Sequence, residues 1–195
     1  MENPPPASGS VFAGENFQKV NWSGKELDRV EFSGCGFRQC GFERTVFRDC
    51  LFEDCEFEAC DLTLAEVTGS SFNPAVFRNC KASGIVWYRV GFAFDAAFLD
   101  CQLDYSSFFG MKLNRVRFTG SRLKEVTFVD AVAKDVHFKG CDLEGAVFTH
   151  TDLSRADFTG AMRYDINVTQ NQVKGAIFDL PEAVRLLSYF GIKLK

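Results

Sequence analysis

The chain carries eight cysteines and two histidines, residue types that often hold transition metals or act as nucleophiles. Cys50, Cys55 and Cys60 follow one another at intervals of five, whereas paired zinc ligands usually lie two to four residues apart. We therefore interpret the cysteines as compact, buried apolar residues rather than as a metal or redox site. So many unpaired thiols indicate a reducing, cytoplasmic location.

The histidines offer no better site. His137 and His150 have no carboxylate, cysteine or second histidine in a matching sequence position. The sequence also lacks a recognisable Ser/His/Asp arrangement, glycine-rich phosphate loop or paired-carboxylate pocket. We therefore expect no catalytic residues, no cofactor and no metal, and a function that is not enzymatic.

Composition narrows the class of partner. The formal net charge is -4, so the chain is not the basic protein that nucleic-acid binding usually requires. No apolar run approaches the ~20 residues of a membrane span, and the first residues do not resemble a secretory signal. We expect neither direct nucleic-acid binding nor membrane insertion.

The segments that position these residues follow an internal repeat of five. Eighteen of the 22 phenylalanines, with other apolar residues, occupy the centres of this repeat. The centres run from Phe12 in steps of five to Phe92, and after a slip of one residue they resume at Phe98 and continue to Phe158. Two residues before most centres stands a small or β-branched residue, and all eight cysteines fall in that position.

A period of five fits neither a helix nor a strand. It predicts a solenoid whose backbone bends by a fixed amount in each repeat. After Phe98 the centres alternate between Phe and Leu, which gives uniform columns only on a four-sided coil. Steps of twenty then predict one column of stacked rings, formed by Phe17, Phe37, Phe57, Phe77, Phe98, Phe118, Phe138 and Phe158.

The ends of the chain differ from this rod. Residues 1–9, with three consecutive prolines, predict a disordered tail. Residues 10–163 form the predicted repeat domain, and residues 164–195 form a C-terminal cap. Within the cap we predict an α-helix from Pro181 to Phe190 that ends before Gly191. Its apolar stripe is expected to cover the last coil with Ala183, Leu186, Leu187 and Phe190.

This pattern resembles the pentapeptide-repeat proteins, which implies a right-handed quadrilateral β-helix, here a rod of ~35 Å. The ending LPEAVRLLSYFGIKL and the single-residue slip resemble a narrower group. It comprises the Qnr-type quinolone-resistance proteins, the mycobacterial fluoroquinolone-resistance protein and the microcin immunity protein. This resemblance implies a homodimer through the C-terminal helix, with candidate interface residues Val184, Leu187, Tyr189 and Phe190.

In that group the dimer imitates duplex DNA and binds DNA gyrase. The resemblance thus implies a bacterial, non-enzymatic protein that protects this type II topoisomerase from quinolones or peptide toxins. The alternative is a cytoplasmic scaffold with another protein partner. Charge supplies a candidate contact surface, an acidic belt formed by Asp49, Glu53, Asp54, Glu56, Glu58, Asp61 and Glu66. A basic belt follows, with Lys112, Arg115, Arg117, Arg122 and Lys124.

Overall fold

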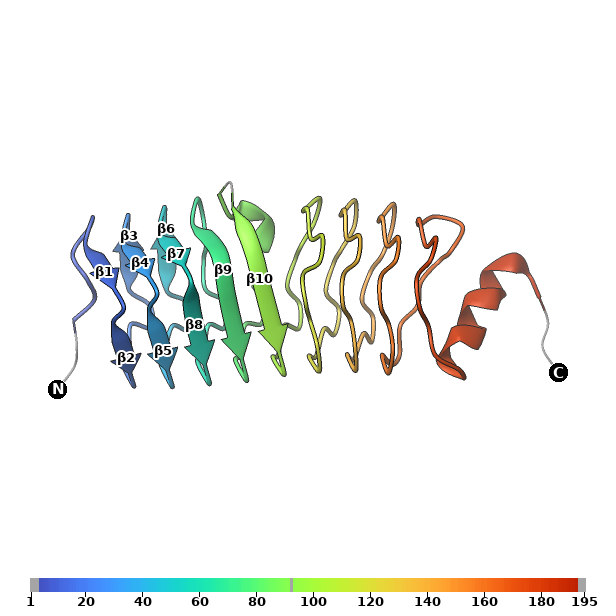
Figure 1. Ribbon diagram of the computed structural model, residues 1–195, viewed down its shortest axis with the longest axis horizontal. Helices are drawn as coiled ribbons and strands as arrows, with labels where there is room; N and C mark the ends of the chain where they lie inside the picture. Colours follow the sequence, from blue (N-terminus) through green and yellow to red (C-terminus); the bar gives the residue numbers. More distant parts are fainter. Residues whose placement is uncertain (1–3, 92, 193–195) are drawn as a thin grey trace.

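The computed structural model describes residues 4–91 and 93–192. The chain winds into a single rod of stacked coils, with the N-terminus at one end and a short helix at the other (Figure 1). The flat sides of the first half are short strands: β1 (Val11–Ala13), β2 (Asn16–Gln18), β3 (Glu26–Asp28), β4 (Glu31–Ser33), β5 (Gly36–Arg38), β6 (Val46–Arg48), β7 (Leu51–Glu53), β8 (Cys55–Glu58), β9 (Ser71–Arg78) and β10 (Phe94–Leu99). A 3-10 turn, η1 (Trp87–Arg89), precedes β10.

Each strand pairs in parallel with the segment one coil later. Phe12 of β1 pairs with Phe32 of β4, and Phe32 in turn pairs with Phe52 of β7. Isolated bridges continue this register through the second half, as from Arg117 to His137. A coil of twenty residues contains four repeats of five, which confirms the predicted four-sided solenoid.

The predicted column of phenylalanine rings is confirmed. Phe57 stacks between Phe37 and Phe77 with ring centroids 4.7 Å away on each side. At the far end Phe158 stacks on Phe138 at 5.0 Å and on Phe178 at 4.8 Å. Parallel in-register pairing places identical side chains one strand spacing apart, so one aromatic can repeat along the whole rod.

Most corners are formed by the residue two positions after a centre. There the backbone enters the left-handed region, with φ of 61° at Gly34 after Phe32 and 49° at Asp54 after Phe52. A residue other than glycine rarely adopts this conformation. Its recurrence every five residues turns the chain onto the next side, which is the regular bend that the five-residue period requires.

One extra residue enters the coil beside η1. Asp61 pairs with Lys81, but Lys81 pairs with Gln102, one residue further on. The pairing of β10 with β9 shifts register between Phe94 and Ala96. This is the interval in which the sequence pattern places the slip, although Phe92, the last centre before it, lies outside the described residues.

The repeat ladder extends further than the expected boundary at residue 163. Asp152 pairs with Gln172, and Asp157 pairs with Ile177. The sequence pattern fades earlier because Tyr164, one position past the expected centre, is fully buried in place of that centre. The loop that follows breaks the five-residue spacing before the ladder resumes at residue 172.

The N-terminal segment is partly attached to the rod. The Ser8 hydroxyl donates a hydrogen bond to the Asp28 carboxylate at 2.7 Å, and the Gly9 amide donates to the Asp28 carbonyl at 3.1 Å. The predicted disorder of residues 1–9 is therefore wrong for residues 8 and 9, whereas residues 1–3 lie outside the described residues.

A short helix closes the C-terminal end as expected, but it is a 3-10 helix, η2 (Glu182–Phe190), and not an α-helix. Its amides donate three residues back, as from Val184 to the Pro181 carbonyl. Three residues per turn align Ala183, Leu186 and Tyr189 on one side. None of its residues is fully buried. No helix among the described residues is long and apolar enough to cross a membrane.

Candidate partner-binding surfaces

All eight cysteines are free and buried, which confirms their predicted inward position. Their thiols donate to backbone carbonyls of the preceding coil, as from Cys55 Sγ to the Phe32 oxygen at 3.4 Å. Burial raises the pKa of Cys50 to about 11 and the pKa of Cys55 and Cys141 to about 12. A neutral, enclosed thiol is a poor nucleophile and a poor metal ligand.

The expectation that the histidines lack a carboxylate in register is wrong. His137 Nδ1 lies 4.0 Å from an Asp157 carboxylate oxygen, and His150 Nδ1 lies 3.5 Å from Asp130. Each aspartate lies one coil away, a spacing of twenty that only the solenoid brings together. Both histidines are well exposed, and the described residues hold no group of three metal-ligating side chains.

The acidic belt surrounds the rod instead of covering one side. Its seven carboxylates lie on all four sides of the coil formed by residues 49–68, and all are exposed except that of Asp61, which is partly buried. Glu58 pairs with Arg38 at 3.2 Å and Asp61 pairs with Lys81 at 3.7 Å. In the described part of the chain the other five form no ion pair: Asp49, Glu53, Asp54, Glu56 and Glu66. We call this feature the acidic ring.

The basic belt covers three of the four sides of the coil of residues 109–128. Arg122 pairs with Asp104 at 2.5 Å, and Lys124 pairs with Glu144 at 3.4 Å. Lys112, Arg115 and Arg117 are exposed and have no ion pair within the described ranges. The free positive charges therefore gather on two adjacent sides.

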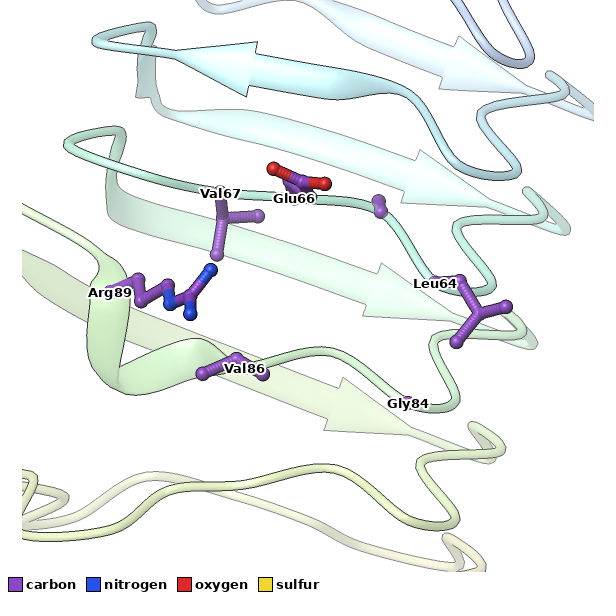
Figure 2. Close-up of a pocket in the computed structure, with 7 residues that line it drawn as sticks. Leu64, Glu66, Val67, Gly84, Val86 and Arg89 are labelled. Atoms are coloured by element: carbon purple, nitrogen blue, oxygen red, sulfur yellow. The ribbon is translucent and has the colours of Figure 1, made fainter.

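A shallow hollow of about 230 Å³ lies between two coils beside the acidic ring. Leu64, Val67 and Val86 supply apolar walls, and the Arg89 guanidinium points into the space between the coils (Figure 2). Gly84 keeps the hollow open, because a Cβ there would lie 2.6 Å from Leu64 Cδ2. Sequence reasoning missed this hollow, since it depends on residues twenty positions apart.

Exposed aromatic rings beside the slip were also missed. Tyr88 and Phe109 are each 47 % exposed, and their ring centroids lie 6.1 Å apart on neighbouring coils. Both follow directly after a repeat centre, where the chain normally carries a polar or small residue. Large aromatics at that outward position are the sequence signal that could have revealed them.

The C-terminal helix divides the candidate interface residues between two faces. Val184, Leu187 and Phe190 form an exposed apolar stripe along η2. Tyr189 instead donates a hydrogen bond from its hydroxyl to the Asp165 carboxylate. The inclusion of Tyr189 in an outward face is therefore wrong, because a three-residue turn places it beside Leu186, which packs on the core. The same turn moves Leu187 and Phe190 away from the rod that they were expected to cover.

Sequence profiles place this solenoid in a family. The profile described as a pentapeptide repeat region matches residues 30–108, and the profile for eight copies of the pentapeptide repeat matches residues 128–162. Together the two profiles cover more than half of the chain. The chain belongs to the pentapeptide-repeat family. No curated protein matches this pentapeptide-repeat sequence closely.

Solved structures add a likeness in fold. A trypsin-treated variant of QnrB1, described as a plasmid-mediated fluoroquinolone resistance protein, superposes with a TM-score of 0.75 over 99 % of this chain and 95 % of that one, at 20 % identity. A second treated variant gives 0.74 over 95 % and 98 %, at 21 % identity, and full-length QnrB1 gives 0.73 over 94 % and 98 %, at 19 % identity. This pentapeptide-repeat protein therefore has the fold of QnrB1 from end to end.

Proposed function

We propose that this protein binds a type II topoisomerase, DNA gyrase, and protects it from poisons such as quinolones or peptide toxins without catalysing a reaction. The observation that carries this proposal is the likeness to QnrB1 over almost the full length of both chains. QnrB1 is described as a fluoroquinolone resistance protein. The shared shape includes both the repeat rod and the segment that closes it.

The acidic ring is the proposed contact with the topoisomerase. Its five unpaired carboxylates are solvated and need not be released from an intramolecular ion pair before they meet a basic partner. A surface that normally receives DNA is basic, since duplex DNA carries a negative charge every ~1.7 Å. In this proposal the imitation of DNA charge is limited to the acidic ring, because the basic belt interrupts the acidic surface further along the rod.

A homodimer through η2 is the second part of the proposal. The helix η2 lies at the end of the rod (Figure 1), and its residues Val184, Leu187 and Phe190 are exposed and apolar. Two copies related by a two-fold axis bury the same stripe against itself. The dimer then doubles the length of the rod, to ~70 Å for coils stacked at ~4.8 Å. The eight free thiols favour a reducing bacterial cytoplasm, where gyrase also acts.

A gyrase supercoiling assay with a quinolone tests this proposal. Added protein is expected to restore supercoiling at a drug concentration that otherwise traps the cleaved complex. The triple variant Glu53→Gln, Asp54→Asn and Glu66→Gln should require at least ~10-fold more protein for the same rescue, because it removes unpaired charges from the proposed contact. The matched control is Glu15→Gln, Glu43→Gln and Glu125→Gln, which removes three exposed carboxylates outside the ring. Indifference of gyrase to the wild-type protein over a wide concentration range would refute the proposal and favour a scaffold with another partner.

A further inference from the structure

One row of side chains on the rod changes from acidic to apolar to basic across four successive coils. Glu56 on β8 pairs with Val76 on β9, and Val76 pairs with Ala97 on β10. Ala97 then pairs with Arg117 on the next coil. All four occupy the outward position before a centre of the phenylalanine column, so their side chains leave the same flat side of the rod in one line. The strands β8, β9 and β10 lie side by side on that side (Figure 1).

The two charged ends of this row are free. Glu56 and Arg117 are both exposed, and within the described residues neither has an ion-pair partner. Two residues earlier on the same coils stand Asp54 and Arg115, which repeat the two signs and are likewise exposed. The side of the rod therefore carries uncompensated negative charge on one coil and positive charge three coils later.

The middle of the row is flat and uncharged. Val76 is half-buried, and Ala97 is only 4 % exposed because its short side chain lies between Val76 and Arg117. β9 and β10 are also the longest strands in the described structure. The row thus has an apolar centre with free charges at its two ends, while the exposed Arg78 and Asp95 lie two residues away on the same strands. An apolar core inside a charged rim is the organisation of a protein–protein interface.

We propose that this side of the rod binds a second copy of the same chain, side by side and antiparallel. A two-fold axis that runs along the strands between β9 and β10 reverses the order of the coils. It places Glu56 opposite Arg117 of the second copy, and Val76 opposite Ala97 of the second copy. Each charge lies one and a half coil spacings from the axis, ~7 Å, so the opposite signs meet at both ends.

The row itself argues for a second copy over an unrelated partner. A surface that met a uniformly acidic or uniformly basic protein would carry one sign, whereas this row carries both signs at equal distances from its centre. Such a row complements only a row with the reverse order, and an antiparallel copy supplies that order. The contact would cover Asp54 and Glu56 of the acidic ring. The second copy would then compete with a topoisomerase for these residues. This competition rests on the proposed function, whereas the contact between the two copies does not.

Sedimentation equilibrium at low and high salt tests the contact without any topoisomerase. The background is Val184→Asp with Phe190→Asp, which removes association through η2. In this background we expect a salt-sensitive equilibrium between the 21.9 kDa protomer and a species of twice that mass. Glu56→Lys and Arg117→Glu should each raise the dissociation constant at least ~10-fold, because each places like charges opposite one another. Glu43→Lys, an equal charge change at an exposed site on another side, is the matched control and should have no such effect.

Charge reversal also distinguishes a direct contact from a general effect of net charge. The chain with both Glu56→Lys and Arg117→Glu should associate again, and so should an equimolar mixture of the two single variants. A background protein that remains monomeric at ~1 mM and low salt would overturn the proposal. So would single variants that behave like Glu43→Lys, or a mixture that does not associate. If the η2 variants fail to fold, the same series is measured in the wild-type chain, where the contact appears as salt-sensitive growth beyond the η2 dimer.

Discussion

At the scale of single residues, the inward phenylalanines are held by neighbours above, below and beside them. Phe57 stacks on Phe37 and Phe77 and also meets the edges of Phe42 and Phe52, with centroids 6.3 and 5.5 Å away. Its exposed fraction is 1 %. Because the surrounding backbone is fixed by hydrogen bonds to both adjacent coils, the rod cannot collapse onto a gap.

Phe57→Ala is expected to lower the free energy of unfolding by ~3–5 kcal/mol, the cost of a core cavity that does not relax. Glu58→Ala, one residue on, should change it by less than ~0.5 kcal/mol, since its ion pair with Arg38 is exposed. Urea denaturation followed by circular dichroism measures both. Similar losses at the two positions would show that the inward register is wrong.

The thiols allow a second test at this scale. Burial raises the pKa of Cys55 and Cys141 to about 12, so very little thiolate is present at pH 8. Titration of the native protein with a thiol reagent at that pH should label few cysteines within an hour, and titration in guanidinium should label all eight. Rapid labelling of several thiols in the folded protein would contradict their inward position.

At the scale of elements, η2 presents two apolar faces that follow from its three-residue turn. Leu186 and Tyr189 face the rod, where Tyr189 bonds to Asp165. Val184, Leu187 and Phe190 face solvent. Capping the rod and associating with a second copy can therefore be separated by substitution.

At high salt we expect Val184→Asp with Phe190→Asp to give a folded monomer of 21.9 kDa by light scattering, because charge on the outward stripe opposes a two-fold apolar contact. Leu186→Ala is the complementary variant. It should lower the free energy of unfolding by about 1–2 kcal/mol through lost packing on the last coil, while the dimer remains. A wild-type mass equal to one protomer at high salt would refute the dimer through η2.

At the scale of the whole molecule, the stability of the rod depends more on the register between coils than on the number of residues in the chain. The centres Phe108 and Phe128 stack at 5.4 Å, while Leu103, Leu113 and Leu123 occupy the neighbouring sides. Each column of side chains therefore stays uniform only if residues are inserted or deleted in whole coils. A deletion or insertion of five residues places phenylalanine rings above leucine side chains in most of the remaining rod.

Deletion of residues 119–138, one complete coil, should leave a folded protein, because each centre after the deletion meets the column to which it belongs. Deletion of residues 119–123 alone should be more destabilising although it removes a quarter as many residues, since Phe128 would then lie above Leu103. Thermal unfolding followed by circular dichroism compares the two. A five-residue deletion as stable as the twenty-residue deletion would show that the columns do not specify the fold.

The sequence by itself determined the solenoid, its four sides, the phenylalanine column and the inward cysteines. The five-residue pattern that specifies these features repeats thirty times, so it can be recognised in the sequence alone. The C-terminal end was harder to predict, because Tyr164 replaces the expected centre. The helix that follows occurs only once, so no repeated pattern supports a prediction of its type. The helix type and the role of Tyr189 were missed for the same reason.

Only the tertiary structure decided which charges are neighbours. Glu56 and Arg117 are sixty-one positions apart in the chain but belong to one row, because parallel pairing connects Glu56, Val76, Ala97 and Arg117 in turn. The acidic belt appears in the sequence as a continuous run, yet the coil distributes it over four sides. Stacking brings together residues one coil apart and separates those that are a few positions apart, so surface chemistry depends on the winding and not on proximity along the chain.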